Sequence, residues 1–250
     1  IKKVPLWRDY ETVNIEGEVR FPGSYPIKRG ERLSAVVARA GGLTDLAFAK
    51  GAVFLREDLR IREEQQLKSL AERLEGDIAA SVANEQISRS ESSQQELLRQ
   101  LRSTEATGRL VISLETALAG DADNPADILL RNGDELLIPR ISQTVTVIGE
   151  VQHPTSHVLQ EDVTHKEYLR MSGGMTSQAD ERRVYVVRAN GSVVSGANGR
   201  LRNRRGEIVY PGDTIVVPVE ADPVSKMALW TSVSTIVYNI GVAAAAVASF

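Results

Sequence analysis

Apolar and polar residues alternate along two short segments that lie far apart in the chain. Val13 and Ile15 alternate with polar neighbours, and Val145 and Val147 do the same. A period of two is typical of a half-buried β-strand. In both segments Gly-Glu-Val follows, with a proline five residues after the glycine. The pattern therefore predicts a turn or bulge and then a strand that tolerates the edge of a sheet.

A short amphipathic helix is expected next in each segment. Thr164 and Glu167 have capping-box spacing, and Tyr168, Leu169 and Met171 supply the apolar face behind them.

In the earlier segment the matching helix is expected from about Leu33 to Ala40, with Val36, Val37 and Ala40 on its buried side. A Gly-Gly pair follows each helix, where a left-handed C-cap is favoured.

These similarities belong to one internal repeat. Gly17 and Gly149 lie 132 positions apart, and Pro22 and Pro154, the two Gly-Gly pairs and the segments VFLR and YVVR share that offset. The closing segments LLRNGDELLIP and IVYPGDTIVVP are offset by 79 positions. The difference places about 53 extra residues inside the first copy.

Each copy reads as strand, strand, short helix and further strands, which predicts a small α+β module with one helix on a mixed sheet. The order G-E-V-x-x-P, helix, A-G-G-L-T, VFLR and G-D-E-L-L-I-P resembles the soluble-ligand-binding β-grasp (SLBB) domain. The second copy departs from the pattern at His153-Pro154-Thr155 and with S-G-G-M-T.

Two such modules before an apolar tail resemble the C-terminal half of the bacterial outer-membrane polysaccharide export family. The likeness covers residues 12–56, 110–218 and the tail. It implies an α+β fold with a linker at 1–11, a first SLBB domain at 12–140, a second at 141–222 and a C-terminal membrane helix at 223–250. Because the first residue is Ile1 and no targeting segment follows, we expect a mature form, a processed piece or a fragment.

The resemblance also implies a function and partners. A homo-oligomeric ring would stack its SLBB domains in the periplasm, and its C-terminal helices would form an α-helical pore in outer-membrane lipid. Capsular or extracellular polysaccharide would pass through, and an inner-membrane polysaccharide co-polymerase or ABC-type exporter would dock beneath.

The insertion at 57–108 has no proline and is densely charged. Two apolar stripes with helical spacing predict a helical hairpin that projects from the first module: Leu67, Leu70, Leu74, Ile78 and Val82, then Leu97, Leu98 and Leu101. The hairpin either packs only on its own domain or contacts a neighbouring subunit or another envelope protein.

Composition excludes several classes of function. The formal net charge of -3 argues against nucleic-acid binding, and the absence of cysteine excludes disulfides and thiolate chemistry. None of the phosphate-binding, zinc-protease or nucleophile-elbow motifs is present, so we expect neither an enzyme nor a cofactor.

The remaining polar clusters have structural readings. His153, His157 and His165 are close in sequence but are expected to point in different directions as surface or turn histidines, without a metal. Asp134 and Asp213 are expected to form Gly-Asp turns rather than a catalytic pair. The arginine-rich stretch 200–205 is either a solvated hairpin tip or a contact for an acidic polysaccharide or subunit.

The tail from 228 to 250 carries no charged side chain. As a helix its 23 residues span about 34 Å, enough for the hydrocarbon layer of a bilayer. A helical wheel separates a lipid-facing side, with Leu229, Val233, Ile236, Val237, Ile240 and Val247, from a milder pore-facing side, with Thr231, Thr235, Asn239 and Ser249.

Three readings of the tail stay open from its residues alone: a stave of a helical barrel, a plain anchor or a core helix. The export resemblance favours the barrel. The alternative function is an SLBB-type module that binds a soluble sugar or cobalamin-like ligand and carries a simple membrane anchor. A third reading is an envelope scaffold that binds through its helical hairpin.

Overall fold

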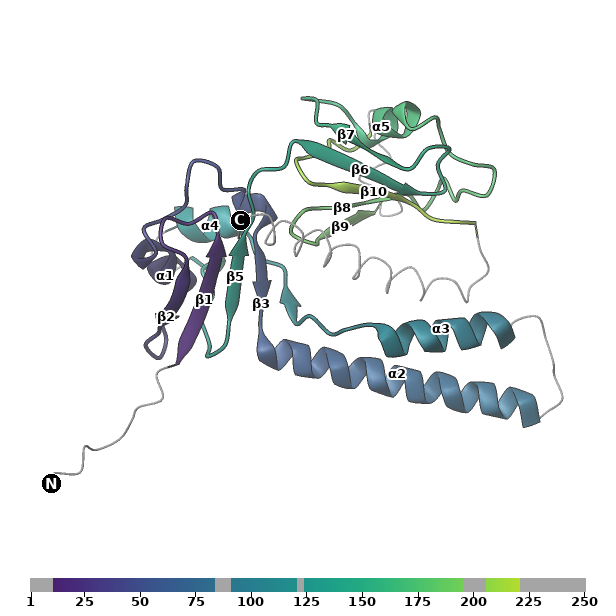
Figure 1. Ribbon diagram of the computed structural model, residues 1–250, viewed down its shortest axis with the longest axis horizontal. Coiled ribbons are helices and arrows are strands. Elements are labelled where there is room, and N and C mark those ends of the chain that lie inside the picture. Colours follow the sequence, from purple (N-terminus) through teal and green to yellow (C-terminus); the bar gives the residue numbers. More distant parts are fainter. Residues whose placement is uncertain (1–10, 84–90, 121–123, 196–205, 221–250) are drawn as a thin grey trace, which may run out of the picture.

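The computed structural model describes residues 11–83, 91–120, 124–195 and 206–220. Two five-stranded mixed sheets are present in this part of the chain, one in each copy of the repeat (Figure 1). We call the parts built on them the first and the second domain. The expected α+β class is therefore confirmed for both domains.

The first domain contains β1 (Thr12–Gly17), β2 (Gly23–Pro26), α1 (Leu33–Arg39), the 3-10 turn η1 (Ala49–Gly51), β3 (Val53–Leu55), β4 (Arg109–Leu110), α4 (Leu114–Ala119) and β5 (Glu135–Ile138). Its sheet order is β2-β1-β5-β3-β4. Strands β1 and β5 run parallel, and the other neighbours are antiparallel. The second strand lies at the sheet edge, as its proline predicts.

The second domain repeats this plan with β6 (Thr144–Gly149), β7 (Thr155–Val158), α5 (His165–Met171), β8 (Tyr185–Val187), β9 (Val193–Ser195) and β10 (Thr214–Val217). Its sheet order, β7-β6-β10-β8-β9, matches the first element by element, again with one parallel pair. The repeat in the sequence is thus a repeat of topology.

Each domain has its own apolar core between the sheet and its helix. The side chains predicted to face inward on β1, α1 and β6 are all buried: Val13, Ile15, Val36, Val37, Ala40, Val145 and Val147. On α5, Tyr168 and Leu169 are buried, whereas Met171 is 42% exposed, so its assignment to the apolar face is wrong. The buried positions of α5 and its C-cap are His165, Tyr168, Leu169 and Ser172, which share one helical face, and Met171 lies off that face.

The helix ends follow the predicted local chemistry. At the start of α5 the Thr164 N–H donates to the Glu167 carboxylate at 2.9 Å, which confirms the capping box. The Gly-Gly pairs after α1 and α5 have positive φ angles of 79 to 85°. This left-handed backbone closes the helices and is strained for residues with a side chain.

The insertion forms the predicted hairpin of α2 (Glu57–Ala83) and α3 (Glu91–Ser103), which projects from the first domain (Figure 1). Its own small core contains Leu67, Leu70, Ala71, Leu74, Leu97, Leu98 and Leu101. At its root the Glu63 carboxylate accepts the N–H groups of Thr107 and Gly108 at 3.0 and 2.9 Å.

The hairpin replaces a connection that is a tight turn in the second domain. It connects β3 with β4, and the equivalent connection in the second domain, between β8 and β9, is a tight turn. In that turn Gly191 N–H donates to the Arg188 carbonyl at 2.8 Å. The two copies of the repeat therefore differ most at a single hairpin connection.

Candidate functional site

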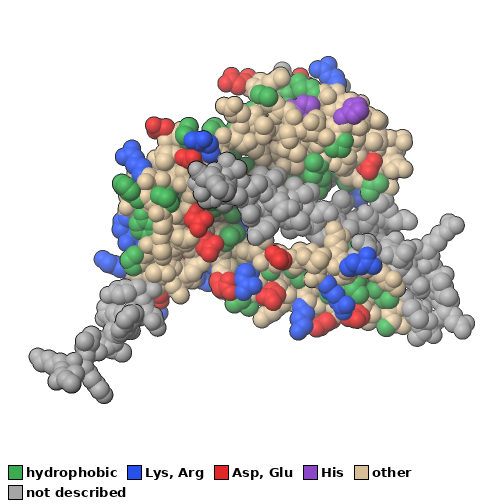
Figure 2. All heavy atoms as spheres, viewed as in Figure 1, with side chains coloured by type: hydrophobic (Ala, Val, Ile, Leu, Met, Phe, Trp, Pro, Cys, Tyr) green, Lys and Arg blue, Asp and Glu red, His purple; other side chains and the backbone are tan. Residues whose placement is uncertain are grey.

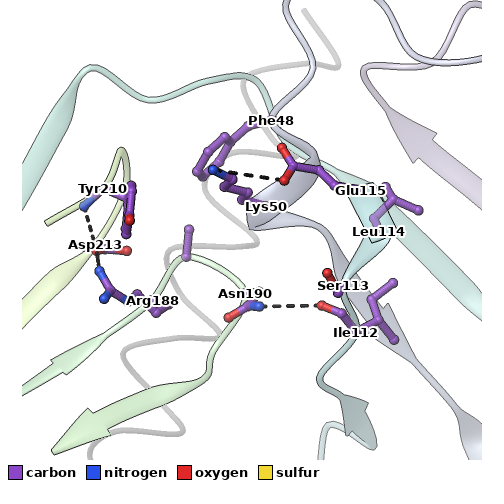
Figure 3. Close-up of a pocket in the computed structure, with 11 residues that line it drawn as sticks. Phe48, Lys50, Ile112, Ser113, Leu114, Glu115, Arg188, Asn190, Tyr210 and Asp213 are labelled. Carbon is purple, nitrogen blue, oxygen red and sulfur yellow. Dashed lines mark hydrogen bonds and ion pairs between the residues drawn. The ribbon is translucent and has the colours of Figure 1, made fainter. Parts of the chain in front are cut away.

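A cleft of about 190 Å³ lies between the two domains (Figure 3). The wall from the first domain is made by the η1 turn with the residue before it and by the start of α4 with the segment before it, and includes Phe48, Lys50 and Glu115. The opposite wall comes from the β8–β9 turn and the Gly-Asp turn before β10, and includes Arg188 and Tyr210. Residues more than 60 positions apart therefore share one site.

The β8–β9 turn packs directly against the first domain. Arg109 Nη2 donates to the Ala189 carbonyl at 3.1 Å, and Asn190 Nδ2 lies 3.5 Å from the Ile112 carbonyl. At Gly51 there is no space for a side chain, because an added Cβ would lie 3.2 Å from the Ala189 Cβ and closer still to the Phe48 ring. The tight β8–β9 turn of the second domain therefore contacts the first domain directly.

Arg109 is an unusual cation in this interface. Among the described residues no carboxylate pairs with it, and its Nε is buried without a hydrogen-bond partner. Burial lowers the pKa of Arg109 to about 10, because desolvation penalises the charged form. Gly191, whose φ is +86°, leaves the space that the guanidinium fills.

Charged groups on the second domain hold Tyr210 in the cleft. Arg188 Nη1 contacts Asp213 Oδ2 at 2.5 Å, and the same guanidinium pairs with Glu207. The Arg188 guanidinium carbon lies 4.8 Å from the centroid of the Tyr210 ring. From the first domain, Lys50 Nζ lies 5.3 Å from that centroid, so one ring receives cations from both domains.

The aspartates of the two Gly-Asp turns form ion pairs in addition to the predicted turn contacts. Asp134 and Asp213 do lie in the turns, where their carboxylates accept the N–H groups of Arg131 and Tyr210 at 2.8 Å. Both aspartates are also fully buried ion-pair partners of the arginines that end VFLR and YVVR. The signal was present in the sequence, because arginine and aspartate recur together in both copies.

The three histidines have separate environments, as expected. His153 is exposed, and His157 Nε2 lies 2.8 Å from Ser172 Oγ. His165 is not a surface or turn histidine: it is 7% exposed in the second core, and its Nδ1 accepts the Glu207 N–H at 3.0 Å. It takes the position that Leu33 has in the first copy, and the single backbone contact makes its burial possible.

In the described part of the chain, no three His, Cys, Asp or Glu side chains come together as metal ligands. No helix of that part is both long and apolar enough to cross a membrane. The predicted lipid-facing and pore-facing residues from Leu229 to Ser249, the membrane helix at 223–250 and the arginine-rich stretch 200–205 lie outside the described residues.

Figure 2 shows that the described surface carries Lys and Arg side chains interspersed with Asp and Glu over both domains and the hairpin. On this face neither sign of charge forms an extended patch, in line with the small net charge.

Comparison with known proteins agrees with the fold. The sequence model of the SLBB domain family matches residues 12–60 and 144–196. The two matched regions fall on the two copies of the repeat, so each copy is similar to an SLBB domain.

Two curated relatives from Escherichia coli, both named "Polysialic acid transport protein KpsD", are 27% identical to the chain over 238 residues. The match covers 95% of this chain but spans only 40% of the length of each relative. The resemblance to the polysaccharide export family is thereby confirmed. Both relatives are transport proteins by name, in agreement with the expectation that the chain is not an enzyme.

Proposed function

We propose that the protein exports capsular or extracellular polysaccharide across the outer membrane as the subunit of a homo-oligomeric ring. The observation that carries this proposal is the match over 95% of the chain to proteins named for polysialic acid transport. The two copies of the repeat support it, because both are similar to SLBB domains and both sheets have the same strand order.

In this proposal the first domain, at 12–140, and the second, at 141–222, lie in the periplasm and build the wall of the ring. The tail at 223–250 inserts into the outer membrane, with Ile236 and Ile240 toward lipid and Thr235 and Asn239 toward the pore. An inner-membrane polysaccharide co-polymerase or ABC-type exporter delivers the polymer from beneath.

Deleting the gene in its host and measuring surface polysaccharide tests the export role. We expect the polymer to disappear from the cell surface and to return when the gene is supplied again. Unchanged surface polysaccharide in the deletion strain would rule out the proposed function.

The tail assignment has its own test. Ile236→Asp should prevent outer-membrane insertion, because a charge facing hydrocarbon costs about 3 kcal/mol or more. Thr235→Asp is the matched control, one position along the helix on the pore-facing side, and should insert much more readily. Equal insertion of the two variants in fractionated membranes would contradict the assignment of the faces.

The alternative function is a module that binds a soluble sugar or cobalamin-like ligand and carries a simple membrane anchor, and the cobalamin-like ligand is the less well supported of the two. Pockets for ligands of drug size or larger occupy about 300–1,000 Å³. The interdomain cleft has about 190 Å³. Its size suits a ligand no larger than a single small ring, so a large cofactor-like ligand does not fit there.

A further inference from the structure

We propose that the outer face of the second sheet is a docking surface for the apolar tail of the same chain, which occupies it before the tail enters a membrane. The outer face is the side of this sheet opposite α5. The inference rests on the proposed function, because a tail that inserts into lipid must first be shielded from water. It goes beyond that function by assigning residues 228–250 a binding surface within the chain.

The outer face of the second sheet is apolar and buried. Val187 on β8 and Val216 on β10 are 2% and 6% exposed, and Ile148 and Tyr185 pack against them. Because side chains alternate along a strand, these four residues point away from the core that α5 covers. Burial raises the pKa of Tyr185 to about 12, since desolvation penalises the phenolate.

The described residues do not account for this burial. Among them, the outer cluster contains only members of β6, β8 and β10. The first domain meets the second at the β8–β9 turn, whereas Val216 pairs with Tyr185 at the other end of β8. A sheet residue that points away from its own core is buried only when a second layer lies over it. A segment outside the described residues therefore supplies that layer.

The equivalent face of the first sheet carries carboxylates. Glu16 has the position of Ile148 and Glu135 that of Thr214, by the repeat offsets of 132 and 79. Glu16 is exposed, and its carboxylate accepts a hydrogen bond from Asn14 Nδ2 at 2.6 Å. Both sheets have the same strand order, so the topology does not require apolar residues on this face. The difference indicates that the second sheet has a cover that the first lacks.

The tail is the segment that fits this cover. It follows β10 in the chain, and residues 228–250 carry no charged side chain, whereas the stretches 1–10, 84–90, 121–123 and 196–205 all do. The connection at 221–227 can span up to about 24 Å when extended. A four-residue strand is about 13 Å long, so the tail can return across the whole face.

One side of the tail matches the sheet. Its predicted lipid-facing residues would pack on β6, β8 and β10, and Thr235 and Asn239 would face water. Because the same apolar side is needed for contact with lipid, docking and insertion exclude each other. The tail leaves the sheet when it inserts.

The test uses the full chain in detergent-free buffer with one introduced thiol, because the chain has no cysteine of its own. The rate of alkylation by N-ethylmaleimide reports how accessible that thiol is. The thiol of Ile240→Cys should react at least about tenfold more slowly than that of Thr235→Cys, since only the first is covered by the sheet.

A second substitution then displaces the tail. Ile148→Glu introduces the residue type that the first copy has at Glu16, and should raise the alkylation rate of the Ile240→Cys thiol at least about tenfold, because burying a carboxylate under the tail is costly. Ile61→Glu is the matched control, the same change at an exposed position of the hairpin, and should leave the rate unchanged. Ile148→Ala should act in the same direction by a smaller factor, and thermal unfolding checks that each variant folds.

Three results would overturn the inference. The first is equal reactivity of the Ile240→Cys and Thr235→Cys thiols, and the second is a rate that neither substitution at Ile148 changes. The third is protection that is lost on dilution, because the tail would then be docked on a second copy of the chain. Any of them, combined with loss of surface polysaccharide in the gene deletion, would refute the docking surface and leave the export function standing.

Discussion

The guanidinium of Arg56 binds both carboxylate oxygens of Asp134, with Nε–Oδ1 and Nη2–Oδ2 distances of 2.9 and 2.7 Å. The same arginine donates to the Leu129 carbonyl at 2.9 Å, and Arg188 repeats this contact with the Ile208 carbonyl at 3.0 Å. In each domain one arginine thus ties the end of a strand to the Gly-Asp turn and to the segment before it. The hydrogen bonds to Asp134 raise the pKa of Arg56, so its guanidinium stays charged.

Replacing Arg56 should destabilise the first domain strongly. Arg56→Met leaves the Asp134 carboxylate, whose side chain is 1% exposed, without its counter-ion, and the expected loss in the free energy of unfolding is about 3–5 kcal/mol. Chemical denaturation measures it. Arg102→Met is the matched control, since Arg102 pairs with Glu75 at 2.8 Å on the exposed hairpin, and should cost no more than about 1 kcal/mol. Equal losses would mean that burial does not decide the strength of these pairs.

Replacing Arg109 should have the opposite outcome. Its charge is largely buried without a described carboxylate, so Arg109→Met removes a desolvation penalty while keeping much of the side-chain volume. We expect the free energy of unfolding to stay within about 1 kcal/mol of the unaltered protein or to rise. A loss comparable to that of Arg56→Met would show that Arg109 has a strong partner.

Gly17 is required by the close approach of β1 and β5. A Cβ added to Gly17 would lie 2.1 Å from the Ile138 carbonyl oxygen, and the φ angle of Gly17 is +83°. Gly17→Ala should therefore lose more than about 3 kcal/mol of stability, because backbone strain and a steric clash add up. Gly30→Ala has a similar φ of +84° but nothing within 4 Å, and should lose only about 1 kcal/mol. Similar melting temperatures for the two variants would contradict the clash.

His165 should make the second domain sensitive to acid. Burial lowers the pKa of His165 below 6.5, partly opposed by the Glu207 contact, so the unfolded chain takes up a proton first as the pH falls. The free energy of unfolding should then decrease below about pH 6.5, with a slope of up to about 1.4 kcal/mol per pH unit from this group. Its stabilising contribution is complete above that pH.

Denaturation at pH 7.5 and 5.5 measures this effect. His165→Leu introduces the residue type that the first repeat has at Leu33, and should remove this part of the pH dependence. His153→Leu changes an exposed histidine and should leave it unchanged. If His165→Leu keeps the full slope, the acid sensitivity has another origin.

Much of the fold could be predicted because the repeat doubles every local signal. Alternation at Val13 and Val145, capping at Thr164 and the paired glycines each appear where two copies agree, and all are confirmed. The hairpin was predictable from the 53-residue difference between the offsets and from its leucine spacing. Met171 was assigned wrongly because it lies off the helical face that buries His165, Tyr168, Leu169 and Ser172.

The interdomain cleft could not be predicted in the same way. Lys50 and Tyr210 meet across two domains, and their counterparts in the other copy are different residues, so the repeat gives no signal there. The burial of His165 was also missed, because a histidine at the start of a short helix is easily assigned to the preceding turn. Its alignment with Leu33 in the first copy indicates an inward-facing position. Contacts between domains depend on how two surfaces meet, which local pattern does not encode.

The mass of the full chain purified in detergent tests the central claim most directly. The account predicts a large homo-oligomer of identical subunits, seen as a single species by light scattering or native mass spectrometry. A stable monomer at micromolar concentration, under conditions in which the chain remains folded, would contradict it.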